Sequence, residues 1–149
     1  MINKKEVYNI FCQQIEQKIQ SATESWNEAN ESVLAETKGS VGDKHETGRA
    51  MAQLEVEKAS KILNETKQMS SIIPLLEPQR TRSSAELGAL IETNLGVFYL
   101  STGIGKIEIE NLTIFCIGMN SPIGKSLSNK KNGEKFYFAD KEGIILNIN

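Results

Sequence analysis

The chain has 149 residues, 39% hydrophobic and 24% charged, which is a globular composition and long enough for one domain or two small modules. A formal net charge of −2 excludes nucleic-acid binding by bulk positive charge, so any such contact must be local. No segment approaches the roughly 20 apolar residues of a membrane span, and the amino terminus lacks the apolar run of a signal peptide. With two cysteines and no CxxC spacing, we expect a soluble, cytoplasmic protein without a membrane partner.

The first predicted element is a long helix from about residue 3 to a group of glycines at Gly39, Gly42 and Gly48. Glycines grouped in a helix-rich stretch indicate a turn. Apolar residues recur every three or four positions before it, which predicts one apolar helix face. This stripe consists of Val7, Phe11, Ile15, Ile19, Ala22, Trp26, Ala29 and Val33.

The second predicted element is another helix after the turn, with a weaker stripe in which Ala and Thr fill some positions. Its predicted members are Met51, Leu54, Ala59, Ile62, Thr66, Met69 and Ile73. A short connection makes two such helices antiparallel neighbours, and each covers the apolar stripe of the other. Residues 1–73 are therefore predicted to form an antiparallel coiled-coil helical hairpin, with a tip near 39–48 and arms on the order of 45 Å long.

A proline-containing segment ends the hairpin, because proline cannot continue a helix. Residues 74–80 are predicted to be a linker and 81–149 a small antiparallel β-rich domain. Six apolar runs separated by turn residues predict strands at 87–91, 97–100, 106–109, 112–117, 136–138 and 144–148, joined in hairpins. The segment 102–105 is interpreted as a hairpin turn. Ser121-Pro122 predicts the start of one short helix, with Ile123 and Leu127 facing inward, so the fold class is α+β.

The candidate chemistry lies at the tip, where Asp43 and Glu46 are three residues apart. Two carboxylates can hold Mg²⁺ together with waters, but a complete site would need ligands from another molecule, as in two-metal phosphoryl chemistry. The same spacing is that of a helix capping box, with Asp43 as the N-cap, and spacing alone favours this interpretation. The two interpretations are compatible. His45 between them is a possible ligand or proton carrier, or an exposed histidine without a role.

Four lysines follow the Ser-Pro turn, at positions 125, 130, 131 and 135. They could contact an acidic partner or a phosphate, or they could be solvated lysines without a function. A Cys-His nucleophilic pair is disfavoured, because Cys116 is predicted on a buried strand and Cys12 far from the tip.

Residues 119–127 read Met-Asn-Ser-Pro-Ile-Gly-Lys-Ser-Leu and are followed by Lys-Lys-Asn-Gly-Glu at 130–134. These segments resemble the "SP-[IL]-[GA]-x-x-L" turn and the "GKKxGD"-like segment of the Gre family of transcription factors, and the order and separation of the turn and the tip extend the resemblance over nearly the whole chain. Residues 42–46, Gly-Asp-Lys-His-Glu, resemble the "GD-x-x-E" tip that joins the family's two helices.

The resemblance implies a carboxy-terminal domain with an FKBP-like fold that docks at the rim of the RNA polymerase secondary channel. The hairpin would enter the channel as a monomer, and its tip would meet the 3′ end of the nascent RNA. Asp43 and Glu46 would help hold the polymerase's second Mg²⁺ and stimulate cleavage of backtracked RNA. The implied docking surface is Ser121, Pro122, Ile123, Gly124 and Lys125. The chain would then be no enzyme itself and would have no cofactor of its own.

The tip departs from the family's usual "SENAEY" run, because residues 45–50 read His-Glu-Thr-Gly-Arg-Ala. The asparagine, the second acid and the aromatic residue are missing, and Gly48 and Arg49 follow the acids. Two further hypotheses therefore stand beside cleavage stimulation. One is a Gre-like protein that binds polymerase without cleavage and regulates or inhibits it. The other is a coiled-coil interaction module that dimerises without contacting polymerase.

Overall fold

A computed structural model describes residues 2–38 and 43–149 of the chain, and the side chains of 2–35 and 47–149. These residues form two compact units, one of residues 15–70 and the other of residues 1–14 and 71–149. The predicted division placed 1–73 in the hairpin and 74–80 in a linker. The unit with the sheet instead includes both the first turns of the chain and the residues from 71 onward.

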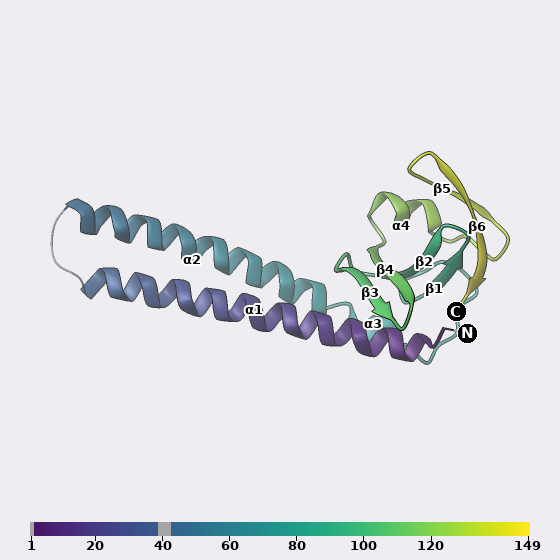
Figure 1. Cartoon of the computed structure of the whole chain (residues 1–149), viewed down its shortest axis with the longest axis horizontal. Helices are drawn as coiled ribbons and strands as arrows, with labels where there is room; N and C mark the ends of the chain where they lie inside the picture. Colours follow the sequence, from purple (N-terminus) through teal and green to yellow (C-terminus); the bar gives the residue numbers. More distant parts are fainter. Residues whose placement is uncertain (1, 39–42) are drawn as a thin grey trace. The chain divides into compact units, whose positions relative to one another are not determined.

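The unit of residues 15–70 contains most of α1 (Lys4–Lys38) and all of α2 (Asp43–Ser70), two long helices that run in opposite directions (Figure 1). The α1 stripe is confirmed, because every predicted member is buried or half-buried and the positions between them are largely exposed. Ala22 keeps 7% of its surface exposed and Leu63 of α2 keeps 9%.

The predicted α2 stripe is wrong at three positions. Met51, Leu54 and Ile62 are 64%, 62% and 47% exposed. The covered face of α2 instead contains Leu63 and the half-buried Val56, together with the correctly predicted Thr66. Apolar residues lie on two faces of this helix, and periodicity alone cannot tell which face becomes covered.

The second unit is built on a six-stranded sheet with the order β3-β4-β2-β1-β6-β5. The strands are β1 (Leu90–Thr93), β2 (Gly96–Ser101), β3 (Gly105–Ile109), β4 (Leu112–Gly118), β5 (Lys135–Phe138) and β6 (Lys141–Ile148). All six lie close to the predicted segments. Two short helices accompany them, α3 (Ile73–Leu76) and α4 (Pro122–Leu127). Helix α2 ends at Ser70, four residues before Pro74, which could not continue it.

The sheet is mixed, which corrects the prediction of an antiparallel one. Strands β2 and β4 pair in parallel, with Tyr99 beside Cys116, whereas the other neighbours are antiparallel. Two-residue turns at 94–95 and 110–111 close the predicted hairpins β1-β2 and β3-β4. The hairpin turn expected at 102–105 is wrong, because β2 and β3 do not pair. That segment is a crossover which lets β4 return beside β2.

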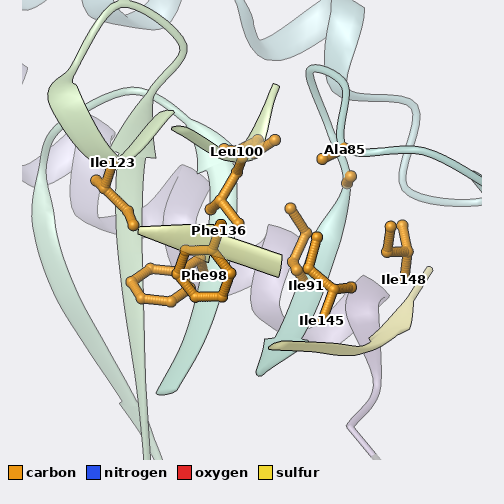
Figure 2. Close-up of a cluster of buried hydrophobic side chains, with 10 residues drawn as sticks. Ala85, Ile91, Phe98, Leu100, Ile123, Phe136, Ile145 and Ile148 are labelled. Carbon is orange, nitrogen blue, oxygen red and sulfur yellow. The ribbon is translucent and has the colours of Figure 1, made fainter. Parts of the chain in front are cut away.

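Each face of the sheet buries side chains from the residues within this unit. On one face Phe11 of α1 places its ring edge-on to Tyr99, with the ring centroids 5.8 Å apart. On the other face a cluster of buried residues joins β1, β2, α4, β5 and β6 (Figure 2). Its members include Ile91, Phe98, Leu100, Ile123, Phe136 and Ile145. Burying a side chain of this size contributes roughly 1.5–3 kcal/mol, so α4 is fixed to the sheet by Ile123 and Leu127.

Candidate functional site

The predicted tip acids lie in the first turn of α2, since this helix begins at Asp43 and continues through Glu46. The side chains of Asp43, His45 and Glu46 lie outside the described residues. Both the metal-binding and the capping interpretations of this pair therefore stay predictions. Thr47 and Arg49, which follow them, are exposed on the same helix.

The Ser-Pro turn is a capped helix start. Ser121 has extended backbone angles, and its Oγ accepts a hydrogen bond from the Gly124 backbone N–H at 3.1 Å. The same hydroxyl donates to the carbonyl oxygen of Gly118 at 2.7 Å. Pro122 occupies the first turn, where its missing N–H costs nothing. Ser121 and Pro122 are thus explained by the geometry of the turn.

Gly124 is required by close packing. A Cβ atom on this residue would lie 2.1 Å from the carbonyl oxygen of Gly118 and 2.9 Å from that of Met119. Ile123 and Leu127 of the same helix are buried in the core. Of the five predicted docking residues, only Pro122 and Lys125 are exposed. The motif that carries the resemblance is therefore largely structural, and these two residues are the ones available to a partner.

The four predicted lysines are not equivalent. Lys125 and Lys131 are exposed and Lys130 is half-buried. Lys135 forms an ion pair with Glu142 at 2.9 Å across the β5-β6 hairpin, and the hydrogen bond to this carboxylate raises the pKa of Lys135. Three of the four lysines thus remain as a positive surface beside the Ser-Pro turn.

Sequence reasoning missed a buried charged cluster near the start of the sheet unit. Lys4 is 3% exposed, and its ammonium donates to the carbonyl oxygen of Arg80. Burial and, to a smaller extent, the positive charges of Arg82 and Arg80 together lower the pKa of Lys4 to about 8. Arg82 is itself buried and forms ion pairs with Glu86 at 3.3 Å and Glu77 at 3.6 Å. Nothing in local sequence spacing indicates this cluster, because Lys4 and Arg82 are far apart in the chain.

The two cysteines and Tyr99 lie in the same unit, on the sheet face that α1 covers. Burial raises the pKa of Cys116 to about 12, raises that of Cys12, and raises that of Tyr99 beyond its usual range. A thiol nucleophile needs the opposite shift. These groups therefore act as core residues. This agrees with the prediction that neither cysteine forms a nucleophilic pair with His45.

Within residues 2–38 and 43–149 no three His, Cys, Asp or Glu side chains whose positions are described gather as metal ligands. No helix in these ranges combines the length and apolar character needed to cross a membrane. The tip acids belong to one unit and the Ser-Pro turn to the other. Comparison with models of known protein families, with curated proteins and with solved structures gave no match.

Proposed function

We propose that this protein is a Gre-type elongation factor, which binds in the secondary channel of RNA polymerase and stimulates cleavage of backtracked RNA. The observation that carries the proposal is the position of Asp43 and Glu46 in the first turn of α2, directly after the connection between two long antiparallel helices. Both residues are near the middle of residues 15–70, and they are therefore far along the chain from both segments of the other unit. The positive end of the α2 dipole also favours negative charge there.

In this proposal the two helices pack as a coiled coil, for which the covered stripe of α1 is the support. The sheet unit has the role of the FKBP-like docking domain. The polymerase supplies the catalytic residues and the first Mg²⁺, whereas Asp43 and Glu46 help to hold a second Mg²⁺ and the attacking water. The chain needs no cofactor of its own and acts in the cytoplasm as a monomer.

The docking part of the proposal is supported by the exposure of Pro122 and Lys125, together with the positive surface of Lys130 and Lys131. The remaining motif residues hold α4 in place. Lys125→Glu is therefore expected to weaken binding to polymerase without lowering the stability of the fold. Substitution of a residue that only maintains the turn, in contrast, would lower the free energy of unfolding.

The test is RNA cleavage in a backtracked complex of polymerase from the same organism. Wild-type protein is compared with the double variant Asp43→Asn, Glu46→Gln, and with the control Glu55→Gln, Glu57→Gln, which removes two exposed carboxylates further along α2. We expect shortened transcripts with the wild type and the control, and none with the tip variant, while all three bind polymerase equally. Equal cleavage by the tip variant would refute the role of these acids.

A second candidate is a Gre-like regulator that occupies the channel without cleavage. It is favoured by the exposed Arg49, whose positive charge follows the tip acids within two turns of α2 and competes with a cation there. Binding to polymerase with no cleavage at any Mg²⁺ concentration would identify this function. Restoration of cleavage by Arg49→Glu, which places an acid where the family's tip has its second one, would then identify the residue responsible.

The third candidate, a dimerising module, is favoured by the uncovered α2 face of Met51, Leu54 and Ile62. Two results together would favour this module over both Gre-type functions. The wild-type protein would show a doubled mass in light scattering that Leu54→Lys reduces to the monomer mass, and it would not be retained on polymerase.

A further inference from the structure

The outer face of the β5-β6 hairpin carries three large apolar side chains in solvent. Tyr137 is 62% exposed, Leu146 61% and Ile144 39%. Tyr137 pairs with Glu142, and Lys135 pairs with Ile144, so Tyr137 and Ile144 share one face of the hairpin. We name Tyr137, Ile144 and Leu146 the ribbon stripe.

The hairpin cannot turn over to bury the ribbon stripe, because its other face is already committed to the core. Phe136 and Ile145 are 0% and 1% exposed there. A Cβ atom on Gly143 would lie 2.3 Å from the ring of Phe136, so the two strands are in close contact with that ring. The stripe therefore stays exposed in the folded unit.

Leu146 is on the same side of β6 as Ile144. The strand alternates exposed and buried residues from Glu142 to Leu146, with Ile145 facing the core, so Ile144 and Leu146 both face outward. A bulge follows, because β1 pairs Thr93 with Ile145 and the adjacent Glu92 with Asn147, so Leu146 has no partner in β1.

A partner is not expected to join this region as an added strand. Strand β5 is the outer strand, but the backbone N–H of Tyr137 already donates to Ser126 Oγ of α4 at 2.9 Å. An added strand would have to displace this bond. Docking on the flat face of the hairpin requires no such loss.

The chain segment that contains the ribbon stripe has a net positive charge, although the whole chain is negative. Residues 119–149 contain five lysines and three acidic residues, a net charge of +2, whereas residues 1–118 contain twelve basic and sixteen acidic residues, a net charge of −4. The loop that contains Lys130 and Lys131 is held next to the stripe, because Gly133 donates to the carbonyl oxygen of Ile145 at 2.8 Å. Lys125 precedes Ser126, the residue bonded to Tyr137.

We propose that the ribbon stripe binds an acidic amphipathic helix of a partner protein. Apolar anchors at positions i, i+3 or i+4 and i+7 of a helix span about 10 Å, and the five residues from Glu142 to Leu146 of the strand span about 13 Å. Acidic residues beside those anchors would meet Lys125, Lys130 and Lys131. This surface is separate from the tip, and the proposal does not depend on the polymerase function.

Single-stranded nucleic acid fits the stripe less well, although lysines and an aromatic residue are present. Only Tyr137 offers a ring for base stacking, because Phe136 is buried and the other members are aliphatic. A protein partner is therefore the occupant that the chemistry favours.

The test is fluorescence anisotropy of the full chain with a labelled helical peptide that has leucines at helical spacing and glutamates on both sides of them. The double variant Tyr137→Ser, Leu146→Ser is expected to weaken binding at least about tenfold, since loss of two anchors removes much of an interface's free energy. Leu75→Ser is the matched control, because Leu75 of α3 is 59% exposed and lies outside the stripe. The control variant should bind as the wild type does.

Charge is tested by Lys130→Gln, Lys131→Gln, which should weaken binding, against Lys106→Gln on the exposed strand β3, which should not. Thermal melts of each variant check the fold. Four results would overturn the proposal: no binding of the peptide, equal binding of a scrambled peptide, tighter binding of single-stranded RNA through Tyr137, or a dimer whose mass is halved by the stripe variant.

Discussion

The substitution Gly124→Ala is expected to destabilise the sheet unit through a single methyl group. The added Cβ would lie 2.1 Å from the Gly118 carbonyl oxygen, well inside the roughly 3.4 Å at which such contacts become ordinary, so α4 must move by about 1 Å. Ile123 and Leu127 would leave their positions in the core with it. Overpacking of this kind costs about 2–3 kcal/mol.

The assay is urea denaturation followed by circular dichroism in the tyrosine band. Tyr8, Tyr99 and Tyr137 are the three tyrosines of the chain, and all belong to the unit of residues 1–14 and 71–149. Trp26 of the other unit has signals in the same region, so it is replaced by Phe in every protein that is compared. Gly103→Ala is the control, because no atom lies within 4 Å of its added Cβ, and it should change stability by less than about 0.5 kcal/mol. A loss of less than about 1 kcal/mol for Gly124→Ala, equal to that of the control, would refute the reasoning.

Three further predictions concern the same unit. Phe11→Ala should lower the free energy of unfolding by about 3–5 kcal/mol in urea denaturation, because Phe11 is fully buried against Tyr99. Phe138→Ala, at a 42% exposed position, should lower it far less, and equal losses of stability would contradict the role of Phe11. Ser121→Ala should cost about 1 kcal/mol in the same measurement, since it removes the acceptor for the Gly124 N–H, and Ser121→Asn should retain most of that stability. Because the pKa of Lys4 is lowered in the folded protein, the unfolded chain binds more protons above pH 8, and the free energy of unfolding should rise between pH 8 and 9. The raised pKa of Cys116 opposes this rise above pH 9. The rise should be lost in Lys4→Met, and an unchanged pH profile in that variant would exclude Lys4 as its source.

The α+β order and the positions of the strands were predictable because they depend on local properties. The α1 stripe recurs with a helical period over eight positions, and the turns at 94–95 and 110–111 are short polar or glycine-flanked segments between apolar runs. Pro74 cannot continue a helix from the preceding residues, so α2 ends before it and Pro74 lies in the first turn of α3. Ser121, Pro122 and Ile123 likewise have their expected local roles at the start of α4.

The pairing of the strands was decided only by the tertiary structure. Residues 102–105 have the composition of a hairpin turn, yet β2 takes β4 as its parallel neighbour, since the crossover through β3 allows Tyr99 and Cys116 to pack on one face. The choice of the covered α2 face was likewise open, because Leu54 and Leu63 are equally apolar and only one of them is buried.

For the candidate site, the sequence alone determined that two acids adjoin the turn between long helices and that a Ser-Pro turn starts a short helix. It could not show that Gly124 is held against the Gly118 carbonyl, that Lys135 is engaged by Glu142, or that Lys4 lies beside Arg82. It also could not show the exposure of Tyr137, Ile144 and Leu146, since that follows from which face of the β5-β6 hairpin meets the core. Each of these features depends on contacts between residues distant in the chain, and periodicity and spacing carry information only about neighbours.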